Sequence, residues 1–323
     1  MRLRRLRGHE KLRALMRETA LDVNDFIYPL FIKHGLLEKN PIQSMPGQYQ
    51  LGISDLKNKV QEIQALGIPA VILFGIPAHK DERGTGALDA NGIIPAAISE
   101  IKQHAPNLLV ISDLCYCEYT SHGHCGAIIE QGGRWVLDND ATLEMLVAQS
   151  LVLVRAGADV IAPSGMIDGM VAAIRQGLDL ESYTQIPILS YAAKYASALY
   201  APFREAAEGA PQFGDRKSYQ MDPANSKEAL REVDLDVQEG ADMLMVKPAS
   251  YYLDIIYQTK SRYPEVPLVA YQVGGEYAMI KAAAQLGWLD EQKTALEALL
   301  SIKRAGSDAI ITLYAMEAAR WLE

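Results

Sequence analysis

Cysteine is scarce in this sequence: only three of the 323 residues are cysteines, and all lie between positions 115 and 125. So small a cluster cannot supply the disulfide framework of a secreted domain, and we interpret the thiols as metal ligands. An uninterrupted apolar run of about 18 residues is also lacking, which argues against a membrane-spanning helix. The charged N-terminus has no apolar segment of the signal-peptide kind, so we expect a cytoplasmic protein.

Positive charge is in short supply as well. The chain has 31 lysines and arginines against 40 acidic residues, a net charge of −9. Binding to nucleic acid requires a basic surface, so we expect no nucleic-acid partner. The one basic cluster lies near the N-terminus, where we expect a solvated arm or a contact with another subunit. Its members are Arg2, Arg4, Arg5, Arg7, Lys11 and Arg13.

Short apolar runs alternate with amphipathic stretches along the whole chain. Eight such runs are candidate strands: Phe26–Ile32, Ala70–Ile76, Leu108–Leu114, Val160–Pro163, Pro187–Tyr191, Met243–Lys247, Leu268–Val273 and Ala309–Leu313. Candidate helices between them include Ile53–Leu66, Ala141–Ala156, Tyr251–Arg262 and Lys293–Arg304. Eight strand–helix units predict an α/β fold, a (β/α)8 TIM barrel over residues 26–323 that follows an arm over residues 1–25. A doubly wound sheet is the alternative, but no Gly-x-Gly-x-x-Gly follows the first strand.

Residues 197–220 form a long connection that contains Gly209, Pro211 and Gly214. Long connections at the catalytic face of a barrel are often lids, and we expect one here. Arg204, Arg216 and Lys217 lie in this segment. Their simplest role is solubility, but basic side chains on a lid also suit a substrate carboxylate.

The cysteines follow the third strand with the spacing Cys115-x-Cys117-x7-Cys125. A structural zinc site closes with four protein ligands, whereas a catalytic site keeps one position for water or substrate. His122 or His124 would complete a structural site, and this alternative stays open from spacing alone. The place of the cluster just beyond a strand end, where TIM barrels carry out catalysis, favours a catalytic metal.

Two lysines are predicted at the ends of neighbouring strands, Lys194 after the fifth and Lys247 at the end of the sixth. A single lysine at a strand end is often just a solvated charge. Two neighbouring ammonium groups in a buried setting lower each other's pKa, and a neutral amine can attack a carbonyl to form a Schiff base. The pair therefore predicts Schiff-base chemistry.

The chain resembles the porphobilinogen synthase (5-aminolevulinate dehydratase) family over essentially its whole length. Six motifs carry the resemblance: Asp113-Leu114-Cys115-Tyr116-Cys117 with Tyr119-Thr120-Ser121-His122-Gly123-His124-Cys125-Gly126, Ser190-Tyr191-Ala192-Ala193-Lys194, Pro202-Phe203-Arg204, Phe213-Gly214-Asp215-Arg216, Tyr219-Gln220 and Met245-Val246-Lys247-Pro248. The resemblance implies a hydro-lyase of tetrapyrrole biosynthesis that condenses two 5-aminolevulinate molecules to porphobilinogen with loss of two waters. It also implies a homo-oligomer, usually an octamer, whose arms embrace neighbouring subunits.

The resemblance assigns roles to particular positions. Lys194 and Lys247 would each hold one substrate as a Schiff base, on the propionate and acetate sides respectively, and Asp113 and Ser164 would assist proton transfer. Catalytic zinc would be bound by Cys115, Cys117 and Cys125, since the sequence is of the cysteine type. A regulatory magnesium would be bound at Glu232, with Arg7 of another subunit nearby. The remaining expected substrate-binding residues are Arg204, Arg216, Lys217, Gln220, Phe203, Tyr191, Gly274 and Leu313.

Several positions depart from the family pattern. Gly274 and Leu313 stand where the family usually has a serine and a tyrosine that bind the acetate-side carboxylate, and Gly165 and Met170 replace an aspartate and an arginine. Hydrogen bonds to a charged group contribute about 1.5–3 kcal/mol each, so the loss of two weakens this subsite substantially. The alternative function is therefore a divergent paralogue that binds zinc and substrate without the full reaction, or that condenses a different carbonyl compound. Tyr314 cannot replace Leu313, because neighbouring strand residues face opposite sides.

Overall fold

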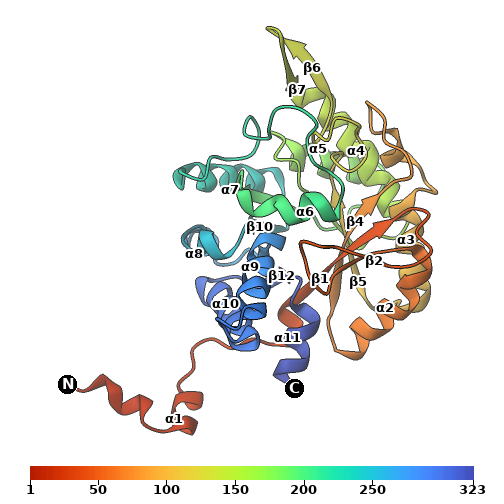
Figure 1. Cartoon of the computed structure of the whole chain (residues 1–323). Coiled ribbons are helices and arrows are strands. Elements are labelled where there is room, and N and C mark those ends of the chain that lie inside the picture. The colour runs from red at the N-terminus through yellow and green to blue at the C-terminus, as the bar shows by residue number, and fades with distance from the viewer.

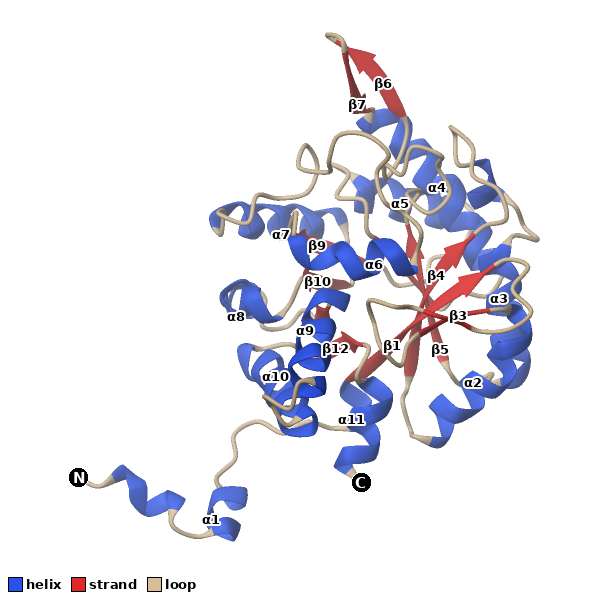
Figure 2. Cartoon of the chain, viewed as in Figure 1, coloured by secondary structure: helices blue, strands red, loops and turns tan.

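The computed structural model describes residues 1–323 and contains an eight-stranded parallel barrel with helices around it (Figures 1 and 2). The barrel strands are β1 (Phe26–Lys33), β4 (Ala70–Ile76), β5 (Leu109–Leu114), β8 (Val160–Pro163), β9 (Leu189–Lys194), β10 (Met243–Lys247), β11 (Leu268–Gln272) and β12 (Ala309–Thr312). Their order is β8-β5-β4-β1-β12-β11-β10-β9. One parallel bridge, Ile161 to Ile188, joins the two ends, so the barrel is nearly closed.

Eleven α-helices accompany the strands, and most of them pack around the outside of the barrel (Figure 2). They are α1 (Glu10–Leu15), α2 (Ile53–Ala65), α3 (Ile93–His104), α4 (Asn139–Arg155), α5 (Met170–Leu180), α6 (Ala201–Ala206), α7 (Lys227–Glu239), α8 (Leu253–Arg262), α9 (Gly274–Gln285), α10 (Glu291–Ala305) and α11 (Ala315–Leu322). None is long and apolar enough to cross a membrane. The predicted TIM barrel is confirmed, and all eight predicted strands overlap barrel strands.

A repeated turn aligns the helices with the strands that follow them. The helices α4, α7 and α10 are each followed by a glycine with positive φ and then, two residues later, by an aspartate: Gly157 and Asp159, Gly240 and Asp242, Gly306 and Asp308. Glycine adopts this conformation at low cost and so ends each helix. Each aspartate accepts a hydrogen bond from the backbone N–H of a neighbouring strand or its entry, at Val110, Ile188 and Leu268 respectively, with distances of 2.7–2.8 Å. The turn therefore fixes the register of adjacent strands.

Two small sheet elements lie outside the predicted pattern. Strands β6 (Ile128–Gln131) and β7 (Arg134–Leu137) form a hairpin that projects from the barrel mouth (Figure 1). Strands β2 (Asn40–Pro41) and β3 (Tyr49–Leu51) pair with each other, and β3 also pairs with β1. The loop between β2 and β3 packs near the ends of β11 and β12, where the Gln48 amide donates to the carbonyl oxygen of Leu313 at 3.3 Å.

The N-terminal residues extend away from the barrel (Figure 1). The 3-10 helix η1 (Leu3–Arg7) and α1 bury no side chain. Leu3, Leu6 and Leu15 are exposed apolar residues on this arm. A second 3-10 helix, η2 (Val23–Asp25), leads directly into β1.

A buried carboxyl between α7 and β9 makes stability depend on pH. The Ser190 hydroxyl donates to Asp236 Oδ2 at 2.6 Å, and burial raises the pKa of Asp236 to about 7, with Glu239 and Glu232 acting in the same direction. The unfolded value is about 3.9, so the folded state binds the proton more tightly. The free energy of unfolding therefore falls as the pH rises from about 4 to about 7.

Replacement of Asp236 by asparagine is expected to stabilise the protein at pH 8 by about 1–2 kcal/mol, because the amide accepts the same hydrogen bond without a buried charge. At pH 4 the variant and wild type should have nearly equal stability. Urea unfolding at both pH values measures the difference. Equal stability of the two proteins at pH 8 would contradict the expected cost of ionising Asp236.

Candidate active site

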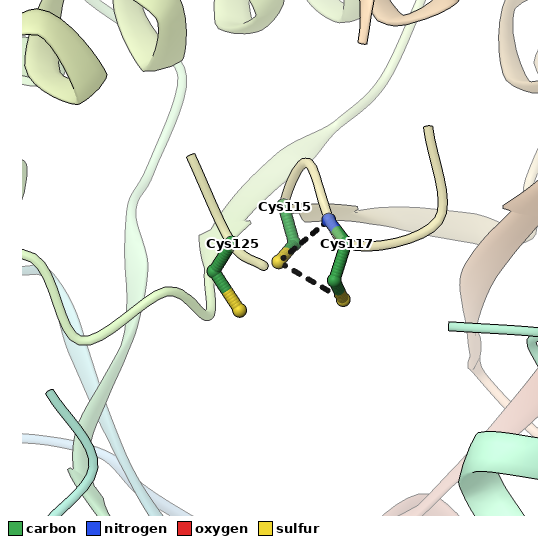
Figure 3. Close-up of side chains that lie close together, drawn as sticks. All are labelled: Cys115, Cys117 and Cys125. Atoms are coloured by element: carbon green, nitrogen blue, oxygen red, sulfur yellow. Dashed lines mark hydrogen bonds between the residues drawn. The ribbon is translucent and has the colours of Figure 1, made fainter. Parts of the chain in front are cut away.

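The three cysteines gather where β5 ends. Cys115 follows Leu114 directly, and the three Sγ atoms of Cys115, Cys117 and Cys125 all lie within 4.8 Å of one another (Figure 3). All three residues are buried. Two sulfurs bound to one tetrahedral zinc ion at about 2.3 Å lie roughly 3.8 Å apart, so this spacing suits zinc. Soft sulfur ligands at this separation form a donor set that fits the ion.

The ionisation of the thiols is linked to cation binding, and hydrogen bonding from Cys115 and Cys117 already lowers the pKa of Cys125. Hydrogen bonding to Cys115 and Cys125, together with burial, raises the pKa of Cys117 well above its usual value. A divalent cation would reverse this effect, because it stabilises thiolates and displaces their protons.

Neither nearby histidine is available as a fourth ligand. His122 Nε2 lies 3.2 Å from the carbonyl oxygen of Glu82, and its Nδ1 accepts from the His124 backbone N–H at 3.0 Å. His124 Nε2 lies 3.1 Å from the carbonyl oxygen of Phe213, and its Nδ1 lies 3.0 Å from the Tyr219 hydroxyl. All four ring nitrogens are therefore engaged, which favours the three-cysteine site over the four-ligand alternative.

The two lysines end neighbouring strands, as predicted, since β9 and β10 pair in a register that places Lys194 beside Lys247. Lys194 Nζ donates to the carbonyl oxygen of Ser164 at 2.5 Å. Both ammonium groups face the ring of Tyr191, at 5.4 Å for Lys194 and 5.2 Å for Lys247. Both side chains are buried.

Aromatic rings surround Lys247. Its Nζ lies 4.2 Å from the ring centroid of Tyr271, 4.7 Å from that of Phe203 and 5.4 Å from that of Tyr200. Burial, with the neighbouring charge of Lys194 acting in the same direction and Asp113 opposing it, lowers the pKa of Lys247 to about 7. A large fraction of Lys247 is therefore neutral at physiological pH and able to act as a nucleophile.

Asp113 and Ser164 lie beside the lysines at the ends of β5 and β8. The Ser164 hydroxyl donates to Asp113 Oδ2 at 3.1 Å, while Asp113 Oδ1 is buried without a partner. Burial raises the pKa of Asp113, although both lysines oppose the shift. This carboxyl is therefore placed to hold and transfer a proton.

Residues 197–220 cover the barrel mouth with the 3-10 helix η4 (Ala198–Tyr200), with α6 and with a long loop (Figure 1). Three of their side chains carry buried nitrogen donors without acceptors: Arg204 Nε, Arg216 Nε and Gln220 Nε2. Lys217 belongs to the same segment, is exposed, and lines a cavity together with Arg204, Arg216 and Gln220. Unpartnered buried donors are uncommon and costly, so this group is suited to an anionic ligand.

The side chains at the centre of the mouth enclose a cavity of only about 10 Å³. Residues of the 197–220 segment form part of its wall, and this volume is about that of one water molecule. A substrate molecule needs more space than this cavity offers, so some of the residues around it must move before substrate can bind. The lining residues are Phe74, Asp113, Cys117, Glu118, Ser164, Lys194, Tyr200, Phe203, Arg204, Arg216 and Lys247.

Sequence reasoning missed Glu118, Tyr200 and Tyr271. Burial raises the pKa of Glu118 to about 7, with the charge of Asp113 acting in the same direction. Glu118 follows a predicted metal ligand directly, and this adjacency was the available signal. The two tyrosines contact Lys247 from a distant segment and from a neighbouring strand, and no local pattern marks them.

Gly274 and Leu313, which differ from the family pattern, are both closely packed in the structure. A Cβ atom on Gly274 would lie 2.7 Å from Met45 Sδ and 3.1 Å from Pro202 Cβ, so the space of a side chain is already taken. Leu313 is 2% exposed. Tyr314 packs against Tyr277 of α9, with ring centroids 4.5 Å apart, and so faces the helices. The reason differs from the predicted one, because β12 ends at Thr312 and neither Leu313 nor Tyr314 is a strand residue.

Glu232 lies on α7 and faces a cavity that Lys217, Tyr219 and Gln220 of the 197–220 segment also line. The cavity has a volume of about 570 Å³, and Asp168, Asp222 and Glu228 line it as well. Burial raises the pKa of Glu232, and the charges of Asp168 and Glu228 act in the same direction. Arg7 is exposed on the arm.

Comparison with known proteins identifies one family for the whole chain. The family model "Delta-aminolevulinic acid dehydratase" matches residues 1–321. The chain is 55% identical over 326 residues to the delta-aminolevulinic acid dehydratase of Synechocystis sp., covering 100% of this chain and 98% of the relative. It is 52% identical over 321 residues to the enzyme of Bacillus subtilis, with 99% and 98% covered.

A crystal structure of delta-aminolevulinic acid dehydratase (porphobilinogen synthase) from Toxoplasma gondii ME49, in complex with the reaction product porphobilinogen, has the same fold. Its TM-score is 0.96 at 44% sequence identity, with 99% of this chain and 91% of that chain covered. Sequence, fold and chain length agree over the full length, and together they assign the chain to one family. The chain belongs to the delta-aminolevulinic acid dehydratase family.

Proposed function

We propose that this chain is a hydro-lyase that condenses two molecules of 5-aminolevulinate to porphobilinogen and releases two waters, with the substrates held as Schiff bases on Lys194 and Lys247. Family membership supports the reaction. The observation that carries the residue assignment is the strand register that pairs the two buried lysines next to the cysteine cluster. Two lysines can each form a Schiff base with the keto group of one 5-aminolevulinate molecule.

Lys247 is the residue best prepared to attack. Its unprotonated Nζ adds to the keto carbon, and the carbonyl oxygen becomes a hydroxyl that must leave as water. Asp113, whose pKa is raised by burial, can supply the proton with which this water departs. Ser164 holds Asp113 through its hydroxyl and Lys194 through its backbone oxygen, so one residue orients both groups.

Zinc bound by Cys115, Cys117 and Cys125 would supply a Lewis acid and a source of hydroxide beside the second substrate. The chain's own part is to hold three sulfurs in a buried cluster next to Asp113 and the lysines. We assign the carboxylate of the first substrate to Arg204, Arg216 and Gln220, because these side chains present buried donors without acceptors. Phe203 and Tyr191 pack against Lys247 and keep water from the imine.

Other roles rest on the family resemblance and on local features. The 197–220 segment is proposed as the lid, supported by the closed cavity beneath it. Gly274 and Leu313 are proposed to line the acetate-side subsite. A homo-octamer is proposed from the family resemblance, and the exposed leucines of the arm support a contact with another subunit. The acidic residues around Glu232 support a regulatory magnesium.

Porphobilinogen formation from 5-aminolevulinate tests the proposal. Purified protein is assayed as isolated, after chelation, and after chelation followed by zinc. We expect turnover that is lost on chelation and restored by zinc. No turnover by folded, zinc-loaded protein at saturating substrate would refute the proposed reaction and favour a divergent paralogue.

The pH dependence of Schiff-base formation tests the state of Lys247. Since its pKa is lowered to about 7, the amine is charged below this pH and neutral above it. Borohydride trapping at Lys247, followed by mass spectrometry, should therefore increase from pH 6 to pH 8 with a midpoint near 7. A midpoint above pH 9 would show that burial does not depress this pKa.

A further inference from the structure

The segment between Ser121 and Cys125 is hydrogen-bonded to the proposed lid. The backbone N–H of Gln212 donates to the carbonyl oxygen of His122 at 3.0 Å. Arg216 Nη2 donates to the carbonyl oxygen of Gly123 at 2.8 Å. The lid is therefore hydrogen-bonded to His122 and Gly123, which lie three and two residues before Cys125.

His124 makes the connection specific. A carbonyl oxygen only accepts hydrogen bonds, so His124 Nε2 carries the proton and donates to Phe213 at 3.1 Å. In the neutral ring Nδ1 is then an acceptor, and the Tyr219 hydroxyl donates to it at 3.0 Å. The rings of His124 and Phe213 also pack, with centroids 4.8 Å apart.

The lid approaches the thiols themselves. Tyr219 packs directly against the cluster of Cys115, Cys117 and Cys125. At Gly123, with φ +72°, a Cβ atom would lie 2.3 Å from the carbonyl oxygen of Ala210, so only glycine permits this approach. Residues 115–125, called here the cysteine loop, therefore pack against the lid.

We propose that residues 122–124 couple occupancy of the cysteine cluster to closure of the 197–220 segment, with His124 and Tyr219 as positioning residues. A cation that draws Cys125 toward Cys115 and Cys117 fixes the preceding residues, and these hold the lid through Gln212, Phe213, Arg216 and Tyr219. The inference deepens the proposed function, since it rests on zinc at the cluster and on the lid role. Coupling is reciprocal, so closure of the lid must also raise the affinity for zinc.

The test uses Tyr219→Phe, which removes one hydroxyl and keeps the ring that packs on the thiols. Lys217 is an exposed trypsin site within the lid. Cleavage after Lys217, identified by mass spectrometry, should be at least about tenfold faster in chelated wild type than in zinc-loaded wild type. In zinc-loaded Tyr219→Phe it should be about two- to tenfold faster than in zinc-loaded wild type, the effect of one lost hydrogen bond.

Zinc affinity, measured by competition with a chromophoric chelator, should fall in Tyr219→Phe by a comparable factor. Tyr251→Phe is the matched control, because Tyr251 is 66% exposed and lies outside the lid and the cysteine loop. His124→Gln, which keeps a donor for Phe213, should show a smaller effect than His124→Ala.

Cleavage that does not respond to zinc, or faster cleavage in Tyr219→Phe with unchanged zinc affinity, would overturn the coupling. Both measurements are independent of turnover. If the enzyme is active but the cleavage rate and the zinc affinity do not change together, only the coupling is refuted. If the two change together in a protein that forms no porphobilinogen, only the proposed reaction is refuted.

Discussion

Replacement of Lys247 by methionine is expected to reduce porphobilinogen formation by at least about a thousandfold. Loss of a covalent nucleophile removes the intermediate itself, and residues that act as one unit show effects of this size or larger. Methionine fills nearly the same volume and suits the aromatic surroundings of this site, so the variant should fold. The thermal midpoint should stay equal or rise, since a buried amine is removed.

The same variant separates the two lysines. After incubation with 5-aminolevulinate and borohydride, Lys247→Met should still carry one adduct, on Lys194, as seen by peptide mass spectrometry. Lys293→Met is the matched control, because the Lys293 side chain is 84% exposed, and it should retain full activity. Substantial turnover by Lys247→Met, or loss of the Lys194 adduct as well, would contradict the assignment of separate substrates to separate lysines.

The placement of these lysines could be predicted because it follows from backbone periodicity. Lys247 ends the apolar run Met243-Leu244-Met245-Val246, and the parallel register with β9 brings Lys194 beside it. Parallel strands of a barrel end at the same face, so each strand end found in the sequence also locates a residue at the mouth. The cysteines were found for the same reason, since they follow β5 directly.

What could not be predicted depends on contacts between distant segments. Phe203 and Tyr200 reach Lys247 from α6 and η4, and no periodicity relates these elements to β10. The contacts of His124 with Phe213 and Tyr219 likewise join residues about 90 positions apart. Spacing alone left the histidines as possible zinc ligands, and only the hydrogen bonds of their ring nitrogens decide the matter.

The β6–β7 hairpin was missed although its turn carries a local signal. Its residues are largely exposed, so hydrophobic periodicity is weak there. Gly132 and Gly133 both have positive φ, as the tight two-residue turn between Gln131 and Arg134 requires. An adjacent glycine pair between two short β-rich runs predicts such a hairpin.

The sequence also identified Gly274 without explaining it. In the structure, Met45 from the β2–β3 loop occupies the space that a side chain at 274 would need. The substitution is thus part of a packed contact between the β2–β3 loop and the first residue of α9. A serine at this position requires Met45 to move, and methionine is flexible enough to do so at modest cost.

Replacement of Cys125 by serine is expected to lower zinc affinity by at least about a hundredfold, because even residues that only support a zinc ligand contribute ten- to a hundredfold. A hydroxyl is a poor substitute for a thiolate as a zinc ligand. Turnover should fall to near zero at limiting zinc. Zinc content by mass spectrometry and competition with a chromophoric chelator measure the loss.

Two features of the chain make this experiment decisive. No cysteine lies elsewhere, so thiol titration of the unfolded protein must give three groups in wild type and two in the variant. Lysine chemistry does not require the thiols, so borohydride should still trap 5-aminolevulinate on Lys194 in Cys125→Ser. If the adduct on Lys194 is retained while zinc and turnover are lost, zinc acts at a step after the first substrate has been captured. Unchanged zinc affinity in Cys125→Ser would contradict the assignment of zinc to the cysteine cluster. An equal loss of adduct and of zinc in a folded variant would contradict the assignment of substrate capture to the lysines alone.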